Sequence, residues 1–221
     1  MRHTDVCKIR WYHVSSRPLI GRFFYEVMIM NLTMPEVETK RLYLRGLEEE
    51  DVVDIFEYCS LPETMRYVSG PKHKDIDFTL RLLRAFYLPY KRRNEPQVWC
   101  LVDQEKEKVI GHMYFHEVSI DQAQLAYMLH PAYWGKGYMH EALPELLQVG
   151  FSQLELRRIT AMVAVSNVRS QKLLESFGFR KEGILKEAEK LSDDCYHDMV
   201  LYAILKKEWR MLYDKNIRSK I

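Results

Sequence analysis

Residues 133–143 carry the spacing that says most about chemistry in this chain. They read YWGKGYMHEAL, with Gly135 and Gly137 on either side of Lys136, between the apolar run Leu125–Leu129 and a segment of helical periodicity. A glycine turn before a helix exposes several backbone N–H groups at the positive end of the helix dipole, and glycine permits positive φ and close approach. The pattern predicts an anion site, for which a pyrophosphate is the best fit.

Further motifs surround this turn. They read ETKRLYLR at Glu38–Arg45, NVRS at Asn167–Ser170, LLESFGFRKEG at Leu173–Gly183 and DMVLYAILKKEW at Asp198–Trp209. In this order they resemble the GNAT superfamily of acyl-CoA-dependent N-acetyltransferases, in particular its RimJ/RimL-like branch, over residues 37–210. The resemblance implies acetyl-CoA as the cosubstrate, an amine as the acceptor, direct attack in a ternary complex, and no metal.

The resemblance assigns the glycine turn to the pyrophosphate of CoA. The family's motif has the form Gln/Arg-x-x-Gly-x-Gly/Ala, and the residues that match it are Trp134, Gly135, Lys136, Gly137, Tyr138 and Met139. Gly137 keeps the central glycine, whereas Trp and Met occupy the first and last positions. Most contacts in such a turn come from main-chain N–H groups, so the motif still implies cofactor binding.

The preceding strand is implied to hold the acetyl group. By resemblance, Tyr127–His130 separates from its neighbouring strand, and the N–H of Met128 or Leu129 faces the acetyl oxygen, with His130 also at the cofactor. A fixed donor aimed at a developing oxyanion is worth roughly 3–4 kcal/mol. Asn167 matches the residue that holds the pantetheine arm; a helix cap is its alternative role.

The catalytic groups are less determined. The tyrosine that usually protonates the thiolate in this family falls at Leu174 and is absent, so Ser170 either donates to the sulfur or caps its helix. An amine with a pKa near ~10 is mostly protonated at neutral pH, so a base is useful. Gln124 stands where many relatives have an acid. The candidate bases that remain are His116, Glu117, His130 and Glu182.

Two histidines raise the question of a metal. His112 and His116 fall on one face of a strand, with Tyr114 between them on that face. No third ligand is apparent in the sequence, so packed or solvated histidines are predicted instead of a metal site.

Composition limits the class of protein. A net charge of +2 argues against a nucleic-acid partner, because such binders carry a marked basic excess. The four cysteines show no CxxC spacing, which favours reduced thiols in a cytoplasmic protein. No apolar run reaches the ~18–20 residues that a membrane span needs. The sequence leaves a monomer and a homodimer equally open.

Hydrophobic periodicity places these motifs on strands and helices. Strands are predicted at 41–45, 97–103, 108–118, 124–129, 158–166 and 196–205, and helices at 48–60, from Asp75 to Tyr87, after Gly137, and from Asn167 or Ser170 to Gly178. Pro144 is expected to bend the third helix. The resemblance implies an α/β (α+β) fold: a central, mixed, mostly antiparallel sheet flanked by helices, with a splayed strand pair forming the acyl-CoA cleft.

The chain divides into three predicted parts: an extension of uncertain role at 1–36, the acetyltransferase domain at 37–210, and a tail at 211–221. The extension is basic and aromatic, so it is either a partner-binding arm or a segment without function upstream of Met30 or Met34. Acceptor specificity is expected from Tyr67–Arg92 and Leu185–Tyr196. The alternative function is a CoA-binding regulator with little turnover, suggested by the missing tyrosine and by Gln124.

Overall fold

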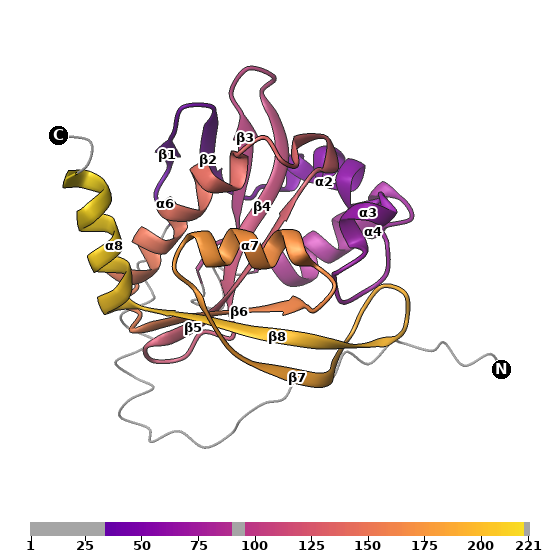
Figure 1. The fold of residues 1–221 in the computed structure, drawn as a ribbon. Helices are drawn as coiled ribbons and strands as arrows, with labels where there is room; N and C mark the ends of the chain where they lie inside the picture. The colour runs from indigo at the N-terminus through magenta and orange to yellow at the C-terminus, as the bar shows by residue number, and fades with distance from the viewer. Residues whose placement is uncertain (1–33, 90–95, 219–221) are drawn as a thin grey trace, which may run out of the picture.

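An eight-stranded sheet runs through the described part of the chain, and helices cover both of its faces (Figure 1). The structure is a computed structural model that describes residues 34–89 and 96–218. The strands are β1 (Val37–Glu38), β2 (Leu42–Gly46), β3 (Trp99–Asp103), β4 (Lys108–His116), β5 (Gln122–Leu129), β6 (Arg158–Ala164), β7 (Arg180–Lys190) and β8 (Tyr196–Leu205). Their order is β1-β2-β3-β4-β5-β6-β8-β7, and only β5 and β6 pair in parallel.

The helices form two layers. On one face α6 (Tyr138–Ser152), α7 (Val168–Ser176) and α8 (Lys206–Arg218) pack on the sheet, and on the other lie α2 (Val52–Cys59), α3 (Pro62–Met65) and α4 (Ile76–Leu82). The π-helical turn η2 (Leu83–Tyr87) extends α4, and the 3₁₀ turns η1 (Glu49–Asp51) and η3 (Pro131–Tyr133) precede α2 and follow β5. No helix of the described residues is long and apolar enough to cross a membrane.

Alternation along the strands divides the core between these layers. Along β5, Ala123, Leu125 and Leu129 are buried in the cluster under α6 and α7, while Met128 packs with the cluster under α2. Successive side chains of a strand point to opposite faces of the sheet, which is why one strand serves both clusters. We call the two sides the α6/α7 face and the α2/α4 face.

The strands β5 and β6 separate soon after they pair. Their register joins Gln122 to Arg158, Ala123 to Ile159 and Gln124 to Thr160, and no pair follows. The rest of β5 stays on β4, while the rest of β6 stays on β8. The splayed pair predicted from the sequence is therefore confirmed, with its apex at Gln124.

Most of the predicted elements are also confirmed. Asp75 caps α4 through a 2.6 Å hydrogen bond from the Phe78 N–H to its carboxylate, and Gly178 follows α7 with φ of +82°. The N-cap of α7 is Asn167, whose side chain accepts from the Ser170 N–H at 3.2 Å, so the capping role considered for Ser170 is wrong.

Two of the observed elements, β7 and α8, were not predicted from the sequence. The strand β7 reads RKEGILKEAEK, and its charged residues conceal the strand because most of them are exposed on a sheet edge. The helix α8 starts at Lys206 and continues through position 211, where the tail was expected to begin. The helix α6 continues through Pro144, so the proline removes one N–H donor without ending the helix. Of the predicted extension, residues 1–33 lie outside the described residues.

Candidate functional site

The glycine turn joins β5 to α6 with an unpaired row of backbone donors. Gly135 and Gly137 have φ of +73° and +82°, a region that L side chains disfavour. The first N–H to enter the hydrogen bonding of α6 is that of Glu141, which donates to Gly137 at 3.2 Å. Within the described residues, the N–H groups of residues 135–140 donate to no protein acceptor. Their arrangement at the start of α6 suits an anion.

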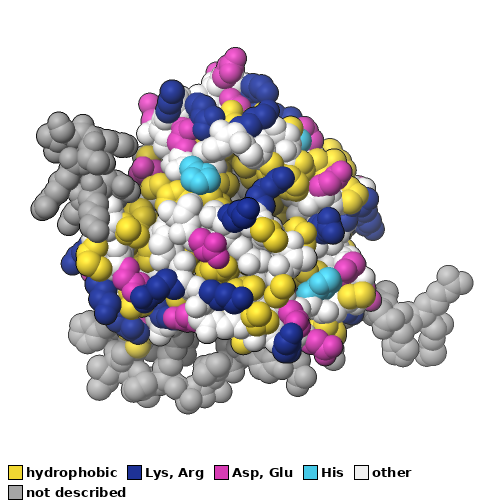
Figure 2. All heavy atoms as spheres, in the orientation of Figure 1, with side chains coloured by type: hydrophobic (Ala, Val, Ile, Leu, Met, Phe, Trp, Pro, Cys, Tyr) yellow, Lys and Arg dark blue, Asp and Glu magenta, His cyan; other side chains and the backbone are white. Residues whose placement is uncertain are grey.

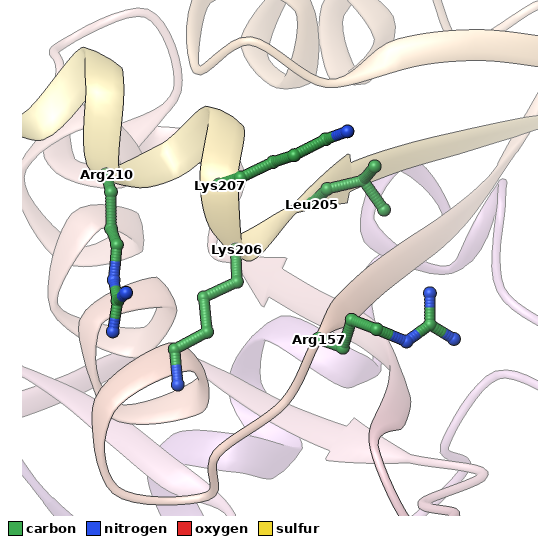
Figure 3. A pocket seen from close by; sticks show the side chains of 5 residues that line it. All are labelled: Arg157, Leu205, Lys206, Lys207 and Arg210. Carbon is green, nitrogen blue, oxygen red and sulfur yellow. The ribbon is translucent and has the colours of Figure 1, made fainter.

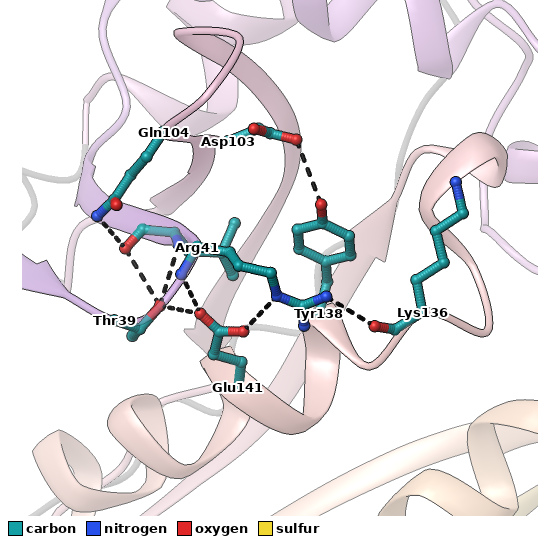
Figure 4. Close-up of polar contacts among 8 residues, drawn as sticks. Thr39, Arg41, Asp103, Gln104, Lys136, Tyr138 and Glu141 are labelled. Atoms are coloured by element: carbon teal, nitrogen blue, oxygen red, sulfur yellow. Dashed lines mark hydrogen bonds and ion pairs between the residues drawn. The ribbon is translucent and has the colours of Figure 1, made fainter.

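An ion pair between Glu141 and Arg41, the residue before β2, lies beside this turn (Figure 4). The Arg41 Nε lies 2.8 Å from the Glu141 carboxylate, which also accepts from the Arg41 N–H at 2.6 Å and from the Thr39 hydroxyl at 2.5 Å. Burial would raise the pKa of Glu141, but the hydrogen bonds from Thr39 and Arg41 lower it overall. The guanidinium also donates to the Lys136 carbonyl at 2.9 Å and lies 4.1 Å from the centre of the Tyr138 ring. The hydrogen bond to the Lys136 carbonyl thus connects the glycine turn to the segment that precedes β2.

Three other positively charged side chains contact aromatic rings beside the turn. Lys106 donates to the Tyr133 hydroxyl at 3.3 Å, and Lys136 lies 5.8 Å from the centre of the same ring. Arg169, at the start of α7, lies 4.7 Å from the centre of the Trp134 ring. Three positive side chains are thus close enough to the turn to meet the charge of an anion bound there.

Trp134 contacts both β5 and α7, at the edge of the space left where β5 and β6 part, which we call the opening. Its indole N–H donates to the Leu129 carbonyl at 2.7 Å, and its ring carries the Arg169 guanidinium. The tryptophan that departs from the family motif therefore connects the two walls of the opening.

Hydrogen-bond register decides which N–H groups of β5 face the opening. The His130 N–H donates to the Ile110 carbonyl of β4 at 2.7 Å. Because N–H groups two residues apart in a strand point to the same side, the Met128 N–H also points to β4. The N–H groups of Leu129 and Tyr127 point to the opposite side of β5, where β6 no longer pairs with it. The Ala123 carbonyl points to the same side, because it accepts a 3.3 Å hydrogen bond from the Thr160 hydroxyl of β6. Of the two donors expected from the sequence, the Leu129 N–H faces the side where β6 no longer pairs, and the Met128 N–H faces β4.

A pair of hydroxyls bridges the opening. The Tyr127 phenol extends from β5 to 2.6 Å from the Ser170 hydroxyl of α7. Burial raises the pKa of Tyr127 to about 12, against the opposing effect of the Ser170 hydrogen bond. Asn167 is one turn earlier at the N-cap of α7, so Asn167, Ser170 and the glycine turn all border the same opening. No motif singles out Tyr127, whose spacing fits a core residue of β5.

Tyrosine and histidine rings cluster on the α2/α4 face of the sheet. His112, Tyr114 and His116 follow one another on β4, with ring centres 6.0 and 5.6 Å apart, and the Tyr87 ring contacts the first two of them. His112 accepts or donates a 2.7 Å hydrogen bond with the Tyr58 hydroxyl. Burial lowers the pKa of both His112 and His116 to about 4, with His73 adding to the effect on His112. This surface is therefore uncharged at neutral pH.

The segments expected to set acceptor specificity border this face. The Tyr67 hydroxyl donates to the Ser166 carbonyl at 3.3 Å, and the Ser69 hydroxyl donates to Glu189 on β7 at 3.1 Å. The loop after α3 and the β7–β8 hairpin thus meet, although they are far apart in sequence. Lys91 and Arg92 of the first segment lie outside the described residues.

The candidate bases do not converge. His130 accepts from the Ala132 N–H at 3.0 Å and lies 3.2 Å from Glu57, which gives its ring a structural role at the start of η3. Glu117 is exposed in the turn after β4, and Arg158 pairs with Glu182 and lowers its pKa. His116 lies on the ring-bearing face, half-buried beside the apex of the splay, while the His130 ring meets the same ring cluster at Tyr58, 6.5 Å between ring centres. In residues 34–89 and 96–218, no three His, Cys, Asp or Glu side chains gather as a metal site.

A hollow at the opposite end of α6 is separate from these residues. Arg157, Leu205, Lys206, Lys207 and Arg210 line it, from the start of β6 and the junction of β8 with α8 (Figure 3). Arg157 follows the end of α6, a 15-residue helix and hence roughly 22 Å long, whereas the glycine turn is at its start. Arg157 pairs with Asp121 and Lys206 with Glu155, so part of its charge is neutralised. Charges of both signs are interspersed on the face shown in Figure 2.

Comparison with known proteins agrees with this arrangement. Residues 41–180 match the model of the acetyltransferase (GNAT) domain. The uncharacterized N-acetyltransferase p20 of Bacillus licheniformis is 31% identical over 178 residues, which are 80% of this chain and 99% of that protein. The [ribosomal protein uS5]-alanine N-acetyltransferase of Escherichia coli is 33% identical over 112 residues, 49% of this chain and 57% of that protein.

Solved structures show the same fold. The spermidine N-acetyltransferase of Vibrio cholerae, in complex with CoA and spermine, superposes with a TM-score of 0.67 at 25% identity, covering 76% of this chain and 98% of that one. An acetyltransferase of Bacillus anthracis superposes with a TM-score of 0.68 at 24% identity, over 79% of this chain and 100% of that one.

Proposed function

The chain belongs to the GNAT acetyltransferase family, and we propose that it transfers acetyl from acetyl-CoA to the primary amine of a peptide N-terminus or a small molecule. The amine attacks the thioester directly, with both substrates bound. The observation that carries this proposal is the presence of two sets of unpaired donors, the N–H groups of residues 135–140 at the glycine turn and those of Leu129 and Tyr127 along the open edge of β5. Phosphate and thioester oxygens need such donors at the two ends of one extended ligand.

The bound cofactor extends from the donors of the glycine turn to those of β5. The pyrophosphate accepts from the glycine turn, with Lys136 and Arg169 supplying positive charge. The pantetheine arm enters between β5 and α7 beside Asn167, and the acetyl oxygen accepts from the Leu129 N–H. That donor is fixed by the strand, so it stabilises the oxyanion of the tetrahedral intermediate without reorganisation.

The acceptor enters from the α2/α4 face. The rings of Tyr87, Tyr114 and His116 form a neutral wall there, and a histidine with a pKa of about 4 is a weak base. At pH 7 roughly one α-amine in ten is already unprotonated, against roughly one lysine amine in a few thousand. A site without a strong base therefore favours an α-amine over a lysine or a polyamine.

The relatives act on different amines, so they do not decide the acceptor. One is named for the alanine of a ribosomal protein and another for spermidine. The free state of the three described cysteines, Cys59, Cys100 and Cys195, fits the cytoplasmic setting that we propose.

The test is CoA release from acetyl-CoA, followed with a thiol reagent across peptides with a free α-amine, Nα-blocked lysine peptides, polyamines and aminoglycosides. We expect turnover with the free α-amines and loss of that turnover in Gly137→Glu. Turnover confined to polyamines would contradict the acceptor class. Calorimetric CoA binding with no turnover for any amine would instead identify a CoA-binding regulator.

A further inference from the structure

The departing thiolate of CoA needs a proton, and α7 does not provide the usual tyrosine. The position that would hold it is Leu174, a fully buried residue one turn after Ser170 on the same helix. A phenol nevertheless lies against this helix, because Tyr127 approaches it from β5 on the opposite wall of the opening.

We propose that Tyr127 is the general acid that protonates the CoA thiolate, and that Ser170 is the residue that positions its phenol. This assignment rests on the proposed function, because it concerns the leaving group of the same acetyl transfer. It moves the acid from α7 to the strand whose N–H groups line the opening, so that a single strand serves both the carbonyl oxygen and the sulfur of one thioester.

The placement of the Tyr127 ring supports the role. Its alternation with Leu125 and Leu129 places the side chain on the α6/α7 face, on the same side of the sheet as the glycine turn and α7. The hydroxyl lies 2.6 Å from the Ser170 hydroxyl, across the gap that opens beyond Gln124. The sulfur of a ligand that lies along this gap passes the phenol on the side opposite to the acceptor.

Nearby hydroxyls in the described residues have other partners. Thr160 donates to the Ala123 carbonyl at the apex of the splay, and Tyr202 donates to Glu175 at 2.7 Å. Tyr127 is hydrogen-bonded to Ser170, whose hydroxyl can accept a hydrogen bond from the phenol in the free enzyme and can rotate away when sulfur is present. Because burial disfavours the phenolate, the phenol keeps its proton at neutral pH and remains a donor.

The step balances without a further reactant. The nitrogen lone pair forms the C–N bond, and collapse of the tetrahedral intermediate breaks the C–S bond and leaves the electron pair on sulfur. The Tyr127 proton moves to sulfur, and the proton lost by the nitrogen returns to the phenolate through solvent. Acetyl-CoA and a neutral amine thus give the amide and CoA thiol.

The first experiment compares Tyr127→Phe with the matched control Tyr202→Phe. Each removes one phenolic hydroxyl that contacts α7 and keeps the ring, but Tyr127 reaches Ser170 from β5, whereas Tyr202 reaches Glu175 from β8. With the best acceptor of the wild type, we expect kcat to fall roughly 10²-fold in Tyr127→Phe, the effect typical of a lost general acid. The calorimetric Kd for acetyl-CoA should change by less than about threefold, and Tyr202→Phe should keep both values.

A second measurement separates an acid from a packing residue. Fluorinated tyrosines placed at position 127 retain the ring and the hydroxyl but lower the phenol pKa. If Tyr127 is the acid, the basic limb of the kcat–pH profile moves to lower pH in step with the substituent. An unmoved limb, or a Tyr127→Phe enzyme as active as Tyr202→Phe, would overturn the assignment while leaving the acetyltransferase intact. A wild type that acetylates no amine would overturn the proposed function itself, and this assignment with it.

Discussion

The two faces of the sheet are built in different ways. On the α6/α7 face, the candidate cofactor site uses backbone donors from two neighbouring segments, Tyr127 and Leu129 on β5 and residues 135–140 in the glycine turn, and two side chains at the start of α7. On the α2/α4 face, the candidate acceptor surface consists of side chains from α2, η2 and β4, brought together by packing. A site made of backbone tolerates changes of side chain, such as Trp134 and Met139 in the motif. A site made of side chains changes its specificity with each of them.

The largest effect should come from placing a side chain where the backbone must face the ligand. Gly137→Val adds a β-branched residue at φ of +82° at the head of α6. We expect calorimetric affinity for CoA to fall roughly 10³-fold, because strain and lost charge-assisted hydrogen bonds add.

Gly70→Val is the matched control for that variant. Gly70 also has positive φ, +115°, and has no atom within 4 Å of an added Cβ, but it is far in sequence from the turn. If both variants reduced CoA affinity equally, the loss would reflect general strain and the backbone site would be refuted.

A second pair of variants tests the direction of the β5 donors. Leu129→Pro removes the N–H that faces the opening, where a strand tolerates proline because no ladder bond is lost. We expect kcat to fall roughly 10²–10³-fold, the effect of losing one oxyanion donor, and the melting temperature to fall through the lost packing of the buried Leu129 side chain. Met128→Pro should lower the melting temperature without this fall in kcat, since its N–H faces β4. The reverse pattern would show that Met128 is the donor.

The buried imidazoles of the α2/α4 face should make stability depend on pH. His112 and His116 have pKa values of about 4 when folded, against about 6.5 in an unfolded chain. As the pH falls through this window, the unfolded chain binds protons first, so stability is complete above about pH 6.5 and is lost toward pH 4. Between pH 7 and pH 5 each histidine should contribute a loss of about 2 kcal/mol in the free energy of unfolding.

Urea unfolding at both pH values measures this loss, and His116→Gln should remove about half of it. Equal stability of the wild type at pH 7 and pH 5 would mean that these imidazoles are protonated in the folded protein.

The smallest effect should come from a single ring of the acceptor surface. Tyr114→Leu keeps an apolar side chain but removes the ring contacts to Tyr87, His112 and His116. We expect the KM for the amine to rise roughly tenfold, the loss of about 1.4 kcal/mol of aromatic contact, while the Kd for acetyl-CoA is unchanged. A change in the acetyl-CoA Kd of the same size would remove the distinction between the two faces.

Local patterns were sufficient for much of the scaffold. Asp75 and Asn167 cap their helices as their residue types suggest, because a cap is a contact within one turn of chain. The strand β7 was missed, since an edge strand with charged residues lacks the alternation that marks a half-buried strand. The helix α8 was not predicted, and a tail was expected from residue 211, although Trp209 packs on Phe151 and extends the core to that helix.

The sequence by itself determined the family and the glycine turn, because the motifs occur in the family's order and the turn depends on backbone conformations that neighbouring residues dictate. Only the tertiary structure showed that the Leu129 N–H, and not that of Met128, points to the open side of β5, because the direction of an N–H depends on which strand it pairs with. Tertiary structure also brought Tyr127 to Ser170, 43 positions away, and paired His130 with Glu57. Contacts between distant segments arise from the way the strands pack and splay, which no short spacing of residues records.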